Sequence, residues 1–202
     1  MGYKVVLFDL DGTIIDTMGA YARLAAKLLS EKKAFPYDQA LRMYLETAGR
    51  PFIDQLRIMG VESDEAEHIY REFIEEKKKV LAGARVSEEV RRFVDELVKA
   101  GIVTAVSTNN ECEVVSKIKG LDVFHVILCF DGRRHRKGKE HVATLKTLLG
   151  EVDEIVFVGD SPYDIKLHRS LGLKTVRTRG LFIKGEIVRV RKELQRLLGV
   201  RL

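Results

Sequence analysis

Short runs of consecutive apolar residues recur along the chain and predict the strands of a buried sheet. The clearest runs are Val5–Phe8, Ile102–Val106, Val126–Phe130 and Ile155–Val158, and a weaker one covers Lys174–Arg177. A strand that is apolar at every position has both of its faces buried, which is typical of parallel sheets covered by helices on each side.

Segments with helical spacing of apolar residues separate these runs. Behind Ser87, a favourable N-cap, apolar residues recur three and four positions apart from Val90 to Val98, and a second such segment runs from Val142 to Gly150. Strands that alternate with helices of about 10–15 residues predict an α/β fold with a doubly wound parallel sheet. In such sheets, ligand sites lie at the carboxyl ends of the strands.

Residues 16–84 interrupt this alternation. They contain no comparable strand run, their apolar residues recur at helical spacing, and Pro36, Gly49, Pro51 and Gly60 divide them into three or four predicted helices. We therefore expect a helical domain of residues 16–84, inserted after the first strand of an α/β domain that comprises residues 1–15 and 85–202.

Composition narrows the class of protein. Hydrophobic residues make up 46% of the 202 residues, which is enough for an ordinary core without disulfides or structural metal. No apolar run approaches the roughly 18 residues of a membrane span, and the first residues lack the layout of a signal peptide. Cys112 and Cys129 have no C-x-x-C spacing. These features predict a cytoplasmic protein with two reduced thiols and no membrane partner.

The net charge of +5 comes from one end of the chain. Residues 160–202 hold eleven basic and four acidic side chains, but no recognised nucleic-acid-binding motif. We interpret this excess as a solvated basic face and expect no nucleic-acid partner. Only two Asn and three Gln accompany the many Lys, Arg and Glu residues, a bias that is typical of proteins from organisms growing at high temperature.

Two carboxylates follow the first predicted strand. The strand ends in Asp9-Leu10-Asp11-Gly12-Thr13, where Gly12 permits a tight turn and a close backbone approach. Repulsion between Asp9 and Asp11 predicts a bound divalent cation. An Asx turn that closes the strand is the purely structural alternative. A calcium loop is disfavoured because Ala20 stands at the twelfth position, where such a loop carries Glu.

Other predicted strands also end in polar groups. Gly159-Asp160-Ser161-Pro162-Tyr163-Asp164 follows the fourth run and Ser107-Thr108-Asn109-Asn110 the second, while a basic stretch, Arg133–Lys139, precedes a helix. Two acid-tipped strands can bring four carboxylates around one point, hydroxyl and amide groups suit phosphate oxygens, and a cation can neutralise a bound anion.

In this order, the motifs resemble those of the haloacid dehalogenase superfamily of phosphotransferases, and they are closest to its phosphoglycolate-phosphatase-like branch. The resemblance rests on Asp9-x-Asp11-Gly12-Thr13, Ser107-Thr108-Asn109, a following Lys and Gly159-Asp160-x-x-x-Asp164, which span nearly the whole chain. It implies a Rossmann-like α/β core, and the helical insertion resembles the cap domain of that branch.

The resemblance implies an Mg²⁺-dependent phosphatase that hydrolyses a small phosphomonoester. Asp9 would be the nucleophile that forms an aspartyl-phosphate, and Asp11 would be the general acid and then the general base. Thr108, Asn109 and a Lys would hold the phosphoryl oxygens, and Gly12 would lie at the substrate. The implied metal site comprises Asp9, Asp11 through its backbone carbonyl, Asp160 and, for its nearby charge, Asp164.

Two positions in the motifs remain open. Members of this branch often carry Lys-Pro-x-Pro where this chain has Lys137-Gly138-Lys139-Glu140, and an ungapped count favours Lys137 over Lys139 as the phosphate-binding Lys. Likewise, the register favours Thr108 over Ser107 in the second motif. The histidines at positions 68, 125, 135, 141 and 168 show no ligand spacing, and we expect them on the surface or on helix faces.

Arg50 is the candidate for substrate specificity. Gly49 can end one helix in a left-handed conformation and Pro51 can begin the next, so that Arg50 lies on a bend where related enzymes place their specificity loop. A guanidinium there would favour substrates with a second anionic or hydroxyl-rich group. A solvated arginine at a helix end is the alternative.

Two other functions share these motifs: a phosphosugar mutase on the same fold, and a non-catalytic module that binds an anion or a metal. A haloacid dehalogenase fits less well, because phosphoryl chemistry uses Asp11 and displacement at carbon does not. The physiological substrate and the oligomeric state do not follow from the sequence.

Overall fold

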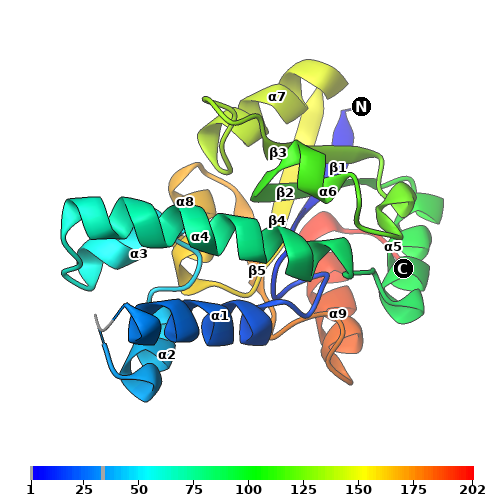
Figure 1. Cartoon of the computed structure of the whole chain (residues 1–202). Helices are drawn as coiled ribbons and strands as arrows, with labels where there is room; N and C mark the ends of the chain where they lie inside the picture. The colour runs from blue at the N-terminus through cyan, green and yellow to red at the C-terminus, as the bar shows by residue number, and fades with distance from the viewer. Residues whose placement is uncertain (1, 33–34) are drawn as a thin grey trace. The chain divides into compact units, whose positions relative to one another are not determined.

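The computed structural model describes residues 2–32 and 35–202. A parallel sheet forms its centre, with the strand order β3-β2-β1-β4-β5 (Figure 1). The strands are β1 (Tyr3–Asp9), β2 (Val103–Glu111), β3 (Val126–Phe130), β4 (Val152–Gly159) and β5 (Lys174–Arg177). Each of the five runs coincides with one of these strands, except that Ile102 lies one residue before β2, and the predicted α/β fold with a doubly wound parallel sheet is confirmed.

Helices cover both faces of the sheet (Figure 1). On one face lie α5 (Glu88–Lys99) and α9 (Glu186–Leu198), which an Arg191–Glu96 ion pair joins. On the other lie α7 (Lys139–Leu149) and α8 (Pro162–Ser170), whose apolar residues share one core cluster with the strands. The short α6 (Cys112–Val115) and the 3₁₀-helix η1 (Leu121–Val123) link β2 to β3. Across residues 2–32 and 35–202, no helix is long and apolar enough to span a bilayer.

Serine caps fix the start of two of these helices. The Ser87 hydroxyl accepts a hydrogen bond from the backbone N–H of Val90, as expected for the N-cap of α5. The Ser161 hydroxyl accepts from the backbone N–H groups of Tyr163 and Asp164, and Pro162 occupies the first turn of α8. A cap of this kind stabilises a helix by about 1 kcal/mol. The second cap also holds Asp164 at a defined place directly after β4.

The chain divides into two compact units. One comprises the residues up to Asp16 together with those from Ala84 onward, and the other comprises Thr17–Gly83. The second unit contains α1 (Met18–Glu31), α2 (Tyr37–Glu46), α3 (Phe52–Ile58) and α4 (Ser63–Ala82). Its helices pack around a cluster of aromatic rings from Tyr21, Tyr44, Phe52 and Phe73. That this unit acts as a cap remains a prediction.

The expectation of two reduced thiols is wrong, because Cys112 and Cys129 form a disulfide with an Sγ–Sγ distance of 2.01 Å. Parallel pairing brings Glu111 of β2 opposite Phe130 of β3, which places the two cysteines side by side although 17 positions separate them. The pairing register of two strands cannot be deduced from cysteine spacing. The disulfide joins the start of α6, directly after β2, to the end of β3, close to the segments that carry Asn109 and Lys137.

Candidate active site

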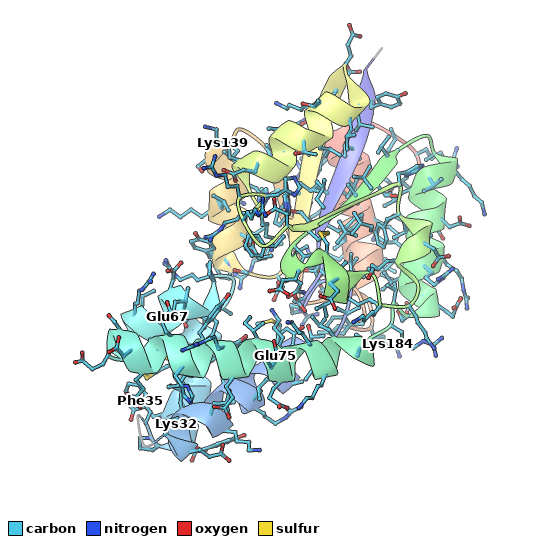
Figure 2. The ribbon with its side chains drawn as sticks, turned by 45° about the horizontal axis from the view of Figure 1, so that its top comes forward. Lys32, Phe35, Glu67, Glu75, Lys139 and Lys184 are labelled. Atoms are coloured by element: carbon cyan, nitrogen blue, oxygen red, sulfur yellow. A yellow bond between two sulfur atoms is a disulfide. The ribbon has the colours of Figure 1, made fainter. Side chains whose placement is uncertain are left out.

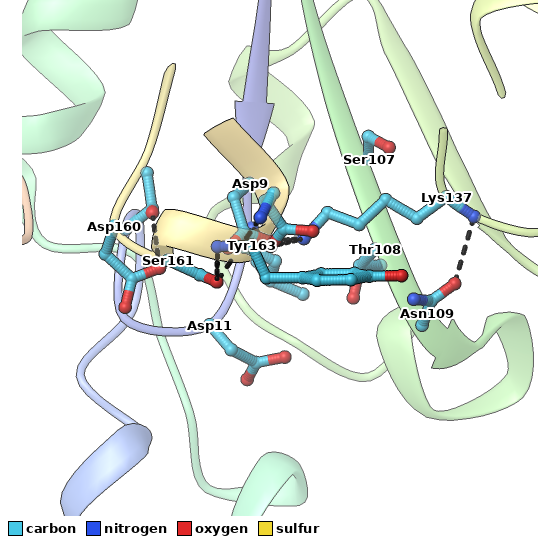
Figure 3. A network of polar contacts seen from close by, with 12 residues as sticks. Asp9, Asp11, Ser107, Thr108, Asn109, Lys137, Asp160, Ser161 and Tyr163 are labelled. Carbon is cyan, nitrogen blue, oxygen red and sulfur yellow. Dashed lines mark hydrogen bonds and ion pairs between the residues drawn. The ribbon is translucent and has the colours of Figure 1, made fainter. Parts of the chain in front are cut away.

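A buried ion pair lies at the carboxyl end of β1 (Figure 3). The Nζ atom of Lys137 lies 2.6 Å from Oδ1 of Asp9 and 2.7 Å from Oδ2 of Asp164. The side chains of these three residues are 6%, 6% and 1% exposed, respectively. The four apolar residues before Asp9 are fully buried, so a rigid strand delivers this carboxylate. The structure thus brings together three residues that the sequence motifs singled out.

For both Asp9 and Lys137, burial and the nearby opposite charge shift the pKa in opposite directions. Burial raises the pKa of Asp9, the Lys137 ammonium lowers it, and the carboxylates of Asp164 and Asp160 raise it further, with a net rise. Burial alone would lower the pKa of Lys137, but Asp164 and Asp9 outweigh it and raise that pKa above its ordinary value. Lys137 therefore stays protonated, and the surrounding carboxylates repel one another.

Asp11 lies apart from this ion pair (Figure 3). Its Oδ2 accepts a 2.7 Å hydrogen bond from Nδ2 of Asn110 at the end of β2. Gly12 has a φ of 73°, which favours glycine, and its N–H donates to the carbonyl of Ile15, so it shapes the turn that carries Asp11. Next to it, the hydroxyl of Thr13 donates to Oδ1 of Asp160 at 3.4 Å. This turn places the two carboxylates of the first motif in different surroundings.

The second motif contributes three polar residues at the end of β2. The Ser107 hydroxyl is buried and hydrogen-bonded to Nδ1 of His141 at 2.8 Å. The Thr108 hydroxyl accepts from the backbone N–H of Asn110 at 3.1 Å, and the side-chain carbonyl of Asn109 accepts from the backbone N–H of Lys137 at 2.9 Å. Because His141 already engages Ser107, Thr108 remains the better candidate for a phosphoryl contact.

The loop that carries Lys137 has internal supports that the sequence motifs did not reveal. Oδ1 of Asp131 accepts hydrogen bonds from the backbone N–H groups of Arg133, Arg134 and His135 at 2.8, 2.9 and 3.0 Å. The His135 ring bridges the carbonyl of Cys129 and the hydroxyl of Thr144, at 3.0 and 2.9 Å. Asp131 and His135 thus anchor the basic stretch to β3 and α7. An Asp two residues before a backbone N–H donor is an Asx-turn signal that could have indicated part of this arrangement.

His141 and His168 lie on α7 and α8, in line with the expected surface or helix-face positions, but both face the core and are fully buried. His168 stacks on Phe157 with ring centroids 3.6 Å apart, and its Nδ1 bonds the carbonyl of Asp164 at 2.8 Å. Burial lowers the pKa of each ring to about 4, so both are neutral at pH 7. They lie behind the site residues Ser107 and Asp164 and support them from within the core.

We expect the lowered pKa of His141 to make the free energy of unfolding depend on pH. Its pKa is about 4 in the folded chain because burial, and then the charge of His135, disfavour the imidazolium; an unfolded histidine titrates near about 6.5. Between these pH values only the unfolded chain binds the proton, so the free energy of unfolding falls as the pH drops. Urea unfolding at pH 7 and pH 4.5 should show this component, worth roughly 2–3 kcal/mol, in the wild type and not in His141→Gln. Equal pH dependence in both proteins would contradict it.

The oxygen ligands suit a magnesium ion, although they do not form a closed cage. In the part of the chain that the structure describes, no three His, Cys, Asp or Glu side chains converge as a metal cluster. The implied ligand set nevertheless needs only the carboxylates of Asp9 and Asp160 and the carbonyl of Asp11, a donor set that Mg²⁺ prefers. Burial raises the pKa of Asp160 as it does that of Asp9, and Oδ1 of Asp164 is buried without a hydrogen-bond partner among the described residues. Burial and mutual repulsion disfavour the ionised form of Asp9 and Asp160, and a divalent cation bound between these carboxylates would offset both effects.

Arg50 belongs to the helical unit, between α2 and α3. Gly49 has a φ of 91°, as the sequence predicted, whereas Pro51 lies at the N-cap of α3, one position before its first turn. The buried Gln55 side chain fixes the bend, because its Nε2 donates to the carbonyl of Arg50 and its Oε1 accepts from the hydroxyl of Thr47. The Arg50 side chain is exposed. Its role toward a substrate stays a prediction.

Comparison with known proteins agrees with these motifs. The family model of the haloacid dehalogenase-like hydrolases matches residues 6–178. Pyrophosphatase PpaX of Bacillus velezensis is 30% identical, over 84% of this chain and 80% of that protein, and phosphoglycolate phosphatase of Rhodospirillum rubrum is 29% identical, over 86% and 78%. A haloacid dehalogenase-like family protein from Streptococcus pneumoniae has a similar fold, with a TM-score of 0.67, 18% identity and coverage of 93% and 90%. The chain belongs to the haloacid dehalogenase-like hydrolase family.

Proposed function

We propose that this protein is a phosphatase that hydrolyses a small phosphomonoester through an aspartyl-phosphate on Asp9. The observation that carries the proposal is the buried carboxylate of Asp9 at the end of β1, held 2.6 Å from the Lys137 ammonium. A nucleophilic carboxylate beside a fixed cation suits attack on an anionic phosphoryl group, because the cation offsets the charge repulsion between them. The relative named phosphoglycolate phosphatase supports hydrolysis of a phosphomonoester, and the relative named pyrophosphatase PpaX supports phosphoryl transfer to water more broadly.

In the first step, a carboxylate oxygen of Asp9 attacks phosphorus and the bond from phosphorus to the ester oxygen breaks. Asp11 donates a proton to the leaving alkoxide as that bond breaks. Lys137, Thr108 and Asn109 hold the phosphoryl oxygens while their charge redistributes. The hydrogen bond from Asn110 keeps the Asp11 side chain at a fixed place, separate from the nucleophile.

In the second step, the now deprotonated Asp11 takes a proton from a water molecule, which attacks the aspartyl-phosphate at phosphorus. The bond between phosphorus and Asp9 breaks, phosphate leaves and the carboxylate is restored. The different surroundings of Asp9 and Asp11 suit this division of roles, since Asp9 accepts from the Lys137 ammonium and Asp11 accepts from the side-chain amide of Asn110.

We further propose that Asp9, Asp160 and the backbone carbonyl of Asp11 hold Mg²⁺, and that Asp164 adds negative charge nearby. When bound, the metal supplies positive charge that stabilises the developing charge on the phosphoryl oxygens. Asp164 also fixes the Lys137 ammonium, at 2.7 Å.

Release of phosphate from p-nitrophenyl phosphate tests the proposal. We expect turnover with Mg²⁺, its loss in EDTA, and recovery when Mg²⁺ is added back. No hydrolysis of this ester or of any member of a metabolite panel in the presence of Mg²⁺ would contradict the proposal. Conversion of a sugar 1-phosphate to its isomer would identify a mutase instead.

Arg50 supplies a separate prediction about specificity. If its guanidinium binds a second anionic or hydroxyl-rich group of the substrate, Arg50→Ala should raise KM about tenfold for the best substrate of the panel, the cost of one charge-assisted hydrogen bond. It should change KM for p-nitrophenyl phosphate less than twofold, since that ester offers no such group. Equal effects on the two substrates, or none on either, would return Arg50 to the role of a solvated surface residue.

A further inference from the structure

A hollow of about 620 Å³ lies on the α/β unit beside Asp160, at the carboxyl end of β5. It is lined by Asp160, Arg177, Thr178, Arg179, Glu186 and Arg189. Three of these six residues are arginines and two are acids, so the lining carries a net positive charge. The catalytic steps proposed above use none of the arginines.

Glu186, the first residue of α9, organises this hollow. Its carboxylate is 3% exposed and accepts hydrogen bonds from the hydroxyl of Thr178 at 2.9 Å, the backbone N–H of Arg179 at 3.0 Å and Nη2 of Arg189 at 2.8 Å. The bond from Arg189 is the main cause that lowers the pKa of Glu186, and the carboxylate is therefore ionised. Arg189 also bonds Glu193 and the carbonyl of Arg177. Glu186 and Arg189 thus form an ion pair with each other, and together they make a fixed wall of the hollow.

Arg177 and Arg179, the other two arginines of the hollow, each have guanidinium N–H groups that can bind a ligand. Arg177 uses its Nε to donate to the backbone carbonyl of Asp160 at 3.2 Å, and its terminal nitrogens have no acceptor within residues 2–32 and 35–202. Arg179 uses its Nε and Nη2 on Glu186, at 3.1 and 3.0 Å, and its Nη1 has no acceptor in that same part of the chain. Both side chains are exposed in the hollow. Guanidinium donors in this arrangement match the oxygens of a carboxylate or a phosphate.

Asp160 connects the hollow to the candidate active site. Its carboxylate accepts from the hydroxyl of Thr13, in the turn after Asp9, and its charge contributes to the raised pKa of Asp9. Asp160 also lines the hollow, and Arg177 bonds its backbone. The donors of Arg177 therefore lie next to a residue of the proposed phosphoryl site, on the side where β5 lies.

We propose that Arg177, assisted by Arg179, forms a second anion-binding subsite that takes a carboxylate or a further phosphate group of the substrate. This inference rests on the proposed function, because it assigns the reacting phosphoryl group to Asp9. It names the substrate class: small phosphate compounds with a second acidic group. The subsite consists of residues of the α/β unit alone, and it is thus independent of Arg50.

Steady-state kinetics with a matched pair of esters test this subsite. Phosphoglycolate and ethyl phosphate share the phosphoryl end, but only the first carries a carboxylate. We expect Arg177→Gln to raise KM at least about tenfold for phosphoglycolate and less than twofold for ethyl phosphate, because one charge-assisted contact is lost. Arg179→Gln should shift KM in the same direction by a smaller factor, and it provides a second variant should the first fold poorly.

Arg196→Gln is the control, since it removes the same charge from an exposed position in the last turn of α9. It should leave both KM values unchanged. Equal losses on the two esters in Arg177→Gln would overturn the proposal, because they would mean that Arg177 only positions Asp160 through its Nε bond. Unchanged KM values for both esters would overturn it as well.

A binding measurement separates this proposal from the proposed function. In the Asp9→Asn background, phosphoglycolate should raise the melting temperature more than ethyl phosphate does, and adding Arg177→Gln should remove that difference. This measurement needs no turnover, so it tests whether the subsite binds a carboxylate even if the wild type hydrolyses neither ester. Sulfate that stabilises the protein only when Arg177 is present, with no difference between the two esters, would overturn the substrate assignment and indicate a site for a free anion.

Discussion

Asp9→Asn should reduce phosphatase turnover by several powers of ten while the fold persists. The amide is a poor nucleophile, and each power of ten in rate corresponds to about 1.4 kcal/mol of lost transition-state stabilisation. The fold should survive because Oδ1 of Asp9 accepts from the backbone N–H of Leu10 at 2.7 Å, and an amide oxygen at the same place can accept that bond. Burial raises the pKa of Asp9, which means that the ionised carboxylate is disfavoured inside the fold, and a neutral amide can therefore replace it. Asp164 continues to pair with the Lys137 ammonium.

The assay needs pure protein and two checks. Asp153→Asn removes one negative charge from an exposed position at the start of β4 and should retain full activity. Circular dichroism and the melting temperature should show that Asp9→Asn remains folded. Substantial turnover by a folded, pure Asp9→Asn protein would end the hypothesis of an aspartyl-phosphate on this residue.

Lys137→Ala should lower kcat/KM by about a hundredfold to a thousandfold, the usual cost of removing one group that stabilises transition-state charge. The loss should exceed that of a surface lysine because Lys137 is buried between Asp9 and Asp164, and its removal leaves two carboxylates facing each other. The variant should also lose stability, by about 3–5 kcal/mol if both carboxylates remain ionised.

Lys139→Ala is the matched control, as it removes the same charge two positions farther along. Lys139 is exposed in the first turn of α7 (Figure 2) and has no ion pair in the ranges 2–32 and 35–202. We expect its kcat/KM to stay within about twofold of the wild type. A larger loss from Lys139→Ala than from Lys137→Ala would show that the sequence register of this motif is off by two.

The fold could be predicted from the sequence because its signals are local. Four of the five strands contain a short apolar run, with β5 the weaker case, and Gly12, Ser87 and Gly49 take the turn or cap conformations that their residue types favour. The site residues could be predicted because parallel strands end at one edge of a sheet. Asp9 and Asp164 meet for that reason, although the chain between them contains 154 residues.

What the sequence did not reveal depends on contacts between distant residues. Burial of His141 depends on how α7 packs against β2, and nothing in its neighbouring residues distinguishes it from an exposed histidine. The disulfide depends on the register of β2 against β3, and the hollow beside Asp160 depends on the path from β5 into α9. Each of these features depends on residues that are distant in the sequence, and local sequence patterns do not specify which of them meet.

The central position of β1 has a consequence for how this chain is made. Val5 pairs with Val103 on one side and with Ile155 on the other, so the first strand to leave the ribosome precedes both of its neighbouring strands by a long stretch of chain. Until those strands emerge, its apolar residues form an unpaired strand, which is prone to aggregation. Residues 17–83 are contiguous and bury their own aromatic cluster, so they can fold during this interval. A pause in synthesis once residue 84 has left the ribosomal tunnel should therefore expose β1 to chaperones while the helical unit is already folded.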